Sequence, residues 1–92
     1  MDLNLIRQDI DAIDSQLVEL LEKRMILVTQ VTAYKKATGK PILDTSREQA
    51  VLDKVASRVV NKDFEKAIIA TFSDIMKESR AYQSAKLGAD EC

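Results

Sequence analysis

Residues 2–38, DLNLIRQDIDAIDSQLVELLEKRMILVTQVTAYKKAT, decide the fold, because their apolar side chains recur at alternating spacings of four and three. One heptad position holds Leu3, Ile10, Leu17 and Val31. The other holds Ile6, Ile13, Leu20, Leu27 and Tyr34. A heptad sustained this long predicts one helix, from Asp2 or Asn4 to near Thr38. Gly39 suits the residue that follows a helix, and Pro41 cannot continue one.

The length of this helix predicts the assembly. At 1.5 Å per residue it is about 50 Å long. A compact chain of 92 residues has a radius of gyration of only about 12 Å. The helix would therefore extend beyond its own subunit and expose its apolar stripe to water. We expect a second copy to pack along it in an obligate or near-obligate homodimer.

Two further helices are predicted after the turn at Gly39. The second starts near Asp44 or Thr45 and ends near Asn61, and the third starts near Asp63 and ends near Leu87, before a short polar tail. Only two glycines, one proline and few aromatic residues occur in the chain, which suits helices better than strands. The fold class is therefore all-α, with one long, one short and one medium helix in a single domain, 1–92, that forms an intertwined homodimer.

The amino-acid composition argues against several classes of function. Fourteen basic and 15 acidic residues give a net charge of −1, which argues against nucleic acid or an anionic membrane as the partner. The chain has no histidine, and Cys92 is its one cysteine, so we expect no imidazole chemistry, metal site, cofactor or internal disulfide. No secretory leader and no membrane-spanning run are recognisable, and we expect a cytoplasmic protein.

Cations interrupt the apolar stripe of the first helix. Arg24 occupies the heptad position between Leu17 and Val31, where a lone charge is costly unless it is paired. Lys35 lies three turns further at almost the same angle, and Arg7 lies on the flank of the stripe. A snorkelling side chain or a structural ion pair would explain Arg24. The alternative is a buried cation that binds an anionic ligand.

Polar residues also lie on the stripe of the second helix. Glu48 is four residues before Leu52 and shares its face. The sequence from Thr45 to Glu48 equally fits a capping box, in which Glu48 would bond the amide at the start of the helix. Asp44 is a second candidate for the N-cap, and Arg47 points away from the stripe.

The third helix carries Ser79 and Gln83 four residues apart on its apolar face. A serine there commonly bonds its own helix backbone, whereas a buried glutamine needs partners at both ends of its amide. Taken together, the polar residues on the inner faces of the three helices predict a pocket that binds a small polyanion. They offer no nucleophile–base pair and no glycine-rich phosphate loop. An enzyme built this way would bind, orient and stabilise charge rather than form bonds to its substrate.

The combined pattern resembles the all-helical chorismate mutases, in particular the monofunctional, bacterial-type members. It covers nearly the whole chain and consists of Arg7-x-x-Ile10-Asp11-x-Ile13-Asp14, Leu17-x-x-Leu20-Leu21-x-x-Arg24, Lys35, Asp44-x-x-Arg47-Glu48 and Ser79-x-x-x-Gln83. The resemblance implies an intertwined homodimer with two identical sites that converts chorismate to prephenate, on the route to phenylalanine and tyrosine.

The resemblance also implies a role for each matched residue. Arg24 and Lys35 would bind carboxylates, and Arg7 would come from the other subunit. Glu48 and the backbone at Asp44 would hold the substrate hydroxyl. The remaining roles are a hold on the ring carboxylate by Ser79, a contact with the ether oxygen by Gln83 and Lys35, and a nearby cation at Arg47. The expected catalytic residues are Lys35, Gln83 and Arg24.

Helix geometry agrees with a shared site. Arg7 and Lys35 are 28 residues apart, which is about 42 Å along one helix. They cannot meet one small ligand within a chain, whereas an antiparallel partner helix could bring its own Arg7 beside Lys35. Two alternatives stay open. An isochorismate-pyruvate lyase would share the cations but tends to lack the glutamate at Glu48, and a non-catalytic dimerisation module would explain the heptad but not the polar residues on the inner faces.

Overall fold

The computed structural model describes the backbone of residues 1–90 and the side chains of residues 1–88. The elements of this part are α1 (Leu3–Thr38), α2 (Thr45–Arg58), the short 3-10 helix η1 (Lys62–Phe64) and α3 (Glu65–Asp90). No strand occurs in residues 1–90, so the predicted all-α class with one long, one short and one medium helix is confirmed. None of these helices combines the length and the apolar character that crossing a membrane requires.

The ends of α1 lie where the sequence predicts them. Asp2 is the N-cap, and its carboxylate accepts a hydrogen bond from the backbone amide of Asn4 at 2.8 Å. Gly39 follows the last turn with φ of 72°, a left-handed conformation that favours glycine. The chain then turns back and continues into α2, which packs against α3 rather than against α1.

Other predicted boundaries were wrong by two or three residues. The second helix ends at Arg58 rather than near Asn61, because the chain is extended at Val59 and Asn61 caps the following 3-10 turn. α3 starts at Glu65 rather than near Asp63. It continues past the predicted end because Gly88 does not adopt positive φ there. Of the predicted tail, residues 91–92 lie outside the described residues.

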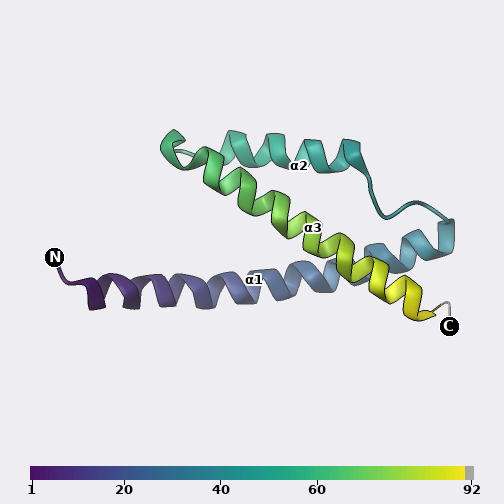
Figure 1. Ribbon diagram of the computed structural model, residues 1–92, viewed down its shortest axis with the longest axis horizontal. Coiled ribbons are helices and arrows are strands. Elements are labelled where there is room, and N and C mark those ends of the chain that lie inside the picture. The colour runs from purple at the N-terminus through teal and green to yellow at the C-terminus, as the bar shows by residue number, and fades with distance from the viewer. Residues whose placement is uncertain (91–92) are drawn as a thin grey trace.

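The three helices make an open, elongated molecule rather than a closed bundle. α3 packs against α2 and crosses the C-terminal half of α1, whereas the N-terminal half of α1 projects alone (Figure 1). The radius of gyration is 16.4 Å, and the overall dimensions are 55 × 26 × 15 Å. These values exceed those of a compact chain of this length. The predicted projection of the first helix is therefore present.

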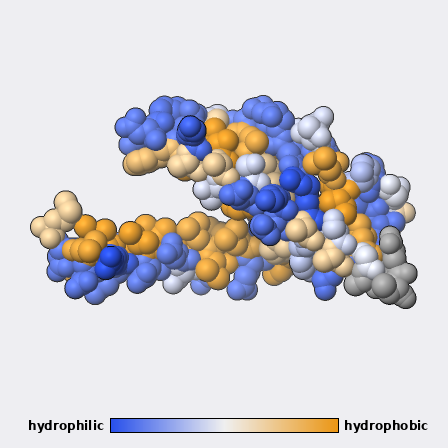
Figure 2. Space-filling model, in the orientation of Figure 1, coloured by the Kyte–Doolittle hydropathy of each residue, from blue (hydrophilic) through white to orange (hydrophobic). Residues whose placement is uncertain are grey.

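The projecting part of α1 has an exposed apolar face. Every residue from 1 to 23 is exposed, and the heptad residues remain accessible throughout, with Leu20 at 60% and Leu27 at 59%. Figure 2 shows apolar surface along the side of α1 that faces the opening of the molecule. Among residues 1–88, Val55 and Met76 are the buried hydrophobic side chains. One chain alone therefore has a very small core.

Candidate active site

A cavity of about 280 Å³ lies where the inner faces of the three helices meet. Seven of the eight predicted site residues line it: Arg24, Lys35, Asp44, Arg47, Glu48, Ser79 and Gln83. The apolar part of the wall includes Val28, Val31, Val51 and Met76. The fold thus brings together side chains from three helices that are up to 59 residues apart in sequence.

The two cations that α1 contributes to the cavity each bond a neutral group. Arg24 Nη1 donates to Ser79 Oγ at 2.9 Å, and Lys35 Nζ donates to the carbonyl oxygen of Ile42 at 2.5 Å. Both side chains are half-buried. Within residues 1–88, no carboxylate forms an ion pair with either. The structural ion pair considered for Arg24 is therefore not present, and both charges remain available to a ligand.

Ser79 and Gln83 are buried at the α3 side of the cavity, each 5% exposed. Ser79 Oγ donates to the carbonyl oxygen of Ile75 at 2.9 Å while it accepts from Arg24, so this serine bonds its own helix and also orients a cation. Gln83 Nε2 donates to the carbonyl oxygen of Ser79 at 3.3 Å. Its Oε1 is buried without a donor, which costs about 1–3 kcal/mol. A buried orphan acceptor indicates a site that is completed by another group.

The N-terminus of α2 corrects the capping-box interpretation. Asp44 is the N-cap, and its carboxylate accepts from the backbone amide of Arg47 at 3.0 Å. Glu48 then lies one position beyond the place that a capping box requires. Its carboxylate instead forms an ion pair with Arg80 and lines the cavity.

Arg47 was expected to point away from the apolar stripe, and it does lie outside the helix contact, with an exposed side chain. It nevertheless lines the cavity. The reason is that α2 begins at the edge of the cavity. The long side chain of Arg47 reaches the cavity from the side of the helix. The apolar stripe predicts which face of α2 packs on α3, but it does not predict which side chains lie at the edge of the cavity.

Arg80 is the site residue that the sequence analysis missed. It lines the cavity beside Glu48 and is about a third exposed. The prediction for this helix rests on a four-residue spacing along one stripe, and Arg80 lies one residue off that stripe. Its spacing of three residues from Gln83, which keeps the two on neighbouring rows of the helix surface, was the available signal.

Arg7 is not brought to the cavity by its own chain. It lies on the exposed N-terminal half of α1 and does not line the cavity that holds Lys35. The predicted separation within one subunit is therefore confirmed.

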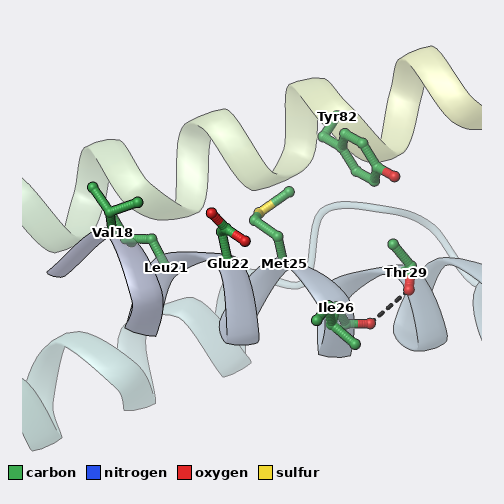
Figure 3. Close-up of a pocket in the computed structure, with 7 residues that line it drawn as sticks. All are labelled: Val18, Leu21, Glu22, Met25, Ile26, Thr29 and Tyr82. Carbon is green, nitrogen blue, oxygen red and sulfur yellow. Dashed lines mark hydrogen bonds between the residues drawn. The ribbon is translucent and has the colours of Figure 1, made fainter. Parts of the chain in front are cut away.

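A second, larger hollow differs in chemistry. Its volume is about 460 Å³, and it lies between α1 and α3. Val18, Leu21 and Met25 of α1 face α3 here, and Tyr82 extends toward α1 from the opposite side (Figure 3). Glu22 is the charged side chain on its wall. A hollow with apolar walls and one carboxylate does not suit an anionic ligand, so we assign the candidate site to the smaller, cationic cavity.

The comparison with known families decides the identity of the fold. Residues 6–84, which include every predicted site residue, match the family model described as chorismate mutase type II. The chain belongs to the chorismate mutase type II family. Membership places it among the chorismate mutases, which are isomerases. The resemblance read from the sequence is thereby confirmed.

Three relatives illustrate the range of this family. A bifunctional chorismate mutase/prephenate dehydratase of Enterobacter agglomerans is 34% identical over 84 residues, which is 89% of this chain but 21% of the relative. A chorismate mutase of Methanocaldococcus jannaschii is 29% identical over 89% of this chain and 84% of its own length. A 4-amino-4-deoxychorismate mutase of Streptomyces venezuelae is 23% identical over 82% of this chain and 73% of its own.

The chain thus spans about a fifth of the bifunctional relative and most of the other two. No solved structure matches it at a comparable level of significance.

Proposed function

We propose that this chain rearranges chorismate to prephenate, the step that leads toward phenylalanine and tyrosine. One observation carries the proposal. Arg24, Lys35 and Arg47 face one cavity, and within residues 1–88 none of them forms an ion pair with a carboxylate. Chorismate carries two carboxylates, an ether oxygen and a ring hydroxyl. A small cavity rich in unpaired cations complements the two carboxylates.

The rearrangement is unimolecular and pericyclic, so the site requires neither a base nor a nucleophile. Arg24 and Lys35 would clamp the carboxylates and hold the substrate in its compact, reactive conformer. Negative charge grows on the ether oxygen as its carbon–oxygen bond breaks. Lys35 and the second amide hydrogen of Gln83 would stabilise that charge, because fixed donors act strongly in a site that excludes water. Glu48 and the backbone at Asp44 would hold the ring hydroxyl.

A second copy of the chain would complete the site. The exposed apolar face along the N-terminal half of α1 is the surface that such a copy would cover, and the small core of one chain indicates that this burial is needed for stability. An antiparallel partner would bring its Arg7 to the cavity beside Arg24 and Lys35. The homodimer, the crossing arginine and a single domain over 1–92 are parts of this proposal.

The relatives suggest a second candidate substrate. The Streptomyces venezuelae relative is named for 4-amino-4-deoxychorismate, in which an amino group replaces the ring hydroxyl. Its 23% identity to this chain is the observation that favours this candidate. Glu48 at the cavity wall counts against an isochorismate-pyruvate lyase, and the polar cavity counts against a purely structural dimerisation module.

The test is to add the purified protein to chorismate and, separately, to isochorismate, and to identify each product. Prephenate as the sole product is the expected result. Release of pyruvate from isochorismate would favour the lyase, and an absence of any turnover by a folded dimer would favour the dimerisation module.

A further inference from the structure

Glu48 does not face the cavity as a free carboxylate. Its Oε1 accepts a hydrogen bond from Arg80 Nη1 in an ion pair that joins the first turn of α2 to α3. The two side chains are 24% and 32% exposed, so water screens this pair only in part. Among the contacts of residues 1–88, Oε1 is the engaged oxygen, and Oε2 can accept a bond from a ligand.

The ion pair changes what this carboxylate can recognise. An isolated carboxylate attracts an ammonium group much more strongly than a neutral hydroxyl, because a charge–charge term adds to the hydrogen bond. The guanidinium of Arg80 is positively charged and offsets the negative charge of Glu48. Glu48 Oε2 can still accept a hydrogen bond from a hydroxyl as well as it would without Arg80. An ammonium group at the same place would lie close to a fixed positive charge.

We infer that Arg80 is a specificity-determining residue that makes this site select a ring hydroxyl and reject a ring amine. The inference rests on the proposed function, in which Glu48 meets the substituent at position 4 of the substrate ring. The surrounding charges act in the same direction. Arg24, Lys35 and Arg47 line the same cavity, so these three cations repel a substrate that carries an additional positive charge.

A purely structural link between α2 and α3 is the competing explanation for the ion pair. The two helices already pack through apolar side chains, and Val55 of α2 and Met76 of α3 are the buried hydrophobic residues of this region. A partly exposed ion pair adds little to such packing. Its placement on the cavity wall, rather than on the outer surface, fits a role in recognition.

The experiment measures kcat/KM for chorismate and for 4-amino-4-deoxychorismate in the parent and in Arg80→Met, with circular dichroism as the check on folding. The parent should prefer chorismate. Arg80→Met should move the ratio of the two constants toward the amine by about tenfold or more, because the freed carboxylate then attracts the ammonium group. Arg80→Lys should keep most of the parent's preference. Lys77→Met removes a positive charge from an exposed position on α3 and should leave the ratio unchanged.

Glu48→Gln provides a second test if Arg80→Met does not fold. It removes the carboxylate and leaves the cation, so the ratio should move further toward chorismate while both rates fall. A folded Arg80→Met or Glu48→Gln protein with the parent's ratio would overturn the role of Arg80, as would a parent that prefers the amine. A parent that rearranges neither compound would overturn the proposed function as well, which separates the two failures.

Discussion

Arg24 is held in position by a hydroxyl group rather than by a carboxylate, so its hydrogen-bond partner carries no opposite charge. The bond from Arg24 to Ser79 Oγ fixes the guanidinium without cancelling its charge. The bond from Lys35 to the carbonyl oxygen of Ile42 does the same for the ammonium group. Neutral partners therefore orient both cations and leave their charges for a substrate.

The first prediction concerns these two cations. Arg24→Ala and Lys35→Ala should each lower turnover of chorismate by roughly a hundredfold or more, because a buried charged contact to substrate contributes several kcal/mol in the transition state. The helical content and the oligomeric state should stay close to those of the parent. The measurements are steady-state kinetics together with circular dichroism and sedimentation. Full activity per folded dimer in both variants would place the site elsewhere.

Gln83 carries the second prediction. A neutral amide donates to the ether oxygen at any ordinary pH, whereas a glutamate donates only when it is protonated. An ionised glutamate at this position would also face the carbonyl oxygen of Ser79, to which the amide now donates. Gln83→Glu should therefore be weak at neutral pH and should recover as the pH falls.

The expected pH of recovery follows from two opposed effects on the new carboxyl. Burial raises its pKa, and the charge of Lys35 lowers it. From the reference pKa of glutamate, we expect the activity of the variant to recover at about pH 5. The measurement is the pH profile of prephenate formation for the variant and the parent. A variant profile with the parent's shape would show that Gln83 does not face the breaking bond.

At the scale of the element, α1 has two halves with different environments. Its C-terminal half packs on α3 and carries Arg24 and Lys35, whereas its N-terminal half projects away from α2 and α3 and keeps an apolar face (Figures 1 and 2). A helix this long with an unpartnered apolar face is expected to pair with another helix. Ile13, 56% exposed in one chain, lies in the middle of that face.

The third prediction tests this face with one matched pair of variants. Ile13→Asp should dissociate the dimer. Each buried isoleucine contributes about 2–3 kcal/mol and occurs once per subunit, so the dissociation constant should rise by roughly a thousandfold. Ser15→Asp adds the same charge two residues away on the opposite side of α1 and should leave the dimer intact. Sedimentation equilibrium measures both. Equal masses for the two variants would mean that this face does not form the interface.

The whole molecule is open on one side, and the proposed site is incomplete without a second copy. The fourth prediction follows from this. Arg7→Ala and Lys35→Ala homodimers should both be inactive, but mixed dimers should hold one site that carries neither substitution. After unfolding and refolding together, an equimolar mixture should recover about a quarter of the parent activity, because half of the dimers are mixed and each has one intact site.

The control for this mixture keeps both substitutions on one chain. Refolding the double variant Arg7→Ala/Lys35→Ala with either single variant should recover no activity, because no pairing then gives an intact site. If mixed dimers form, as shown by mass spectrometry of differently tagged chains, and the first mixture stays inactive, then Arg7 does not cross between subunits.

The sequence alone determined much of this protein. The heptad from Leu3 to Tyr34 fixed one long helix, since a 3-4 spacing of apolar residues has a single regular interpretation. Asp2 and Gly39 marked its ends through capping preferences that act within a few residues. The polar residues on apolar faces pointed to Arg24, Lys35, Glu48, Ser79 and Gln83, because burying a polar group costs free energy unless a ligand or a protein group satisfies it.

Only the tertiary structure decided how these residues are paired. The ion pair of Glu48 with Arg80 depends on how α2 lies against α3, and the three-residue spacing between Arg80 and Gln83 was too weak a signal to single out Arg80. The ends of α2 and α3 differ from the prediction for a local reason instead, since Asn61 caps a 3-10 turn and Gly88 stays helical. Local patterns record which face of a helix is buried. The partner of a charged side chain on that face depends on contacts between segments that are distant in sequence, and these contacts exist only once the chain has folded.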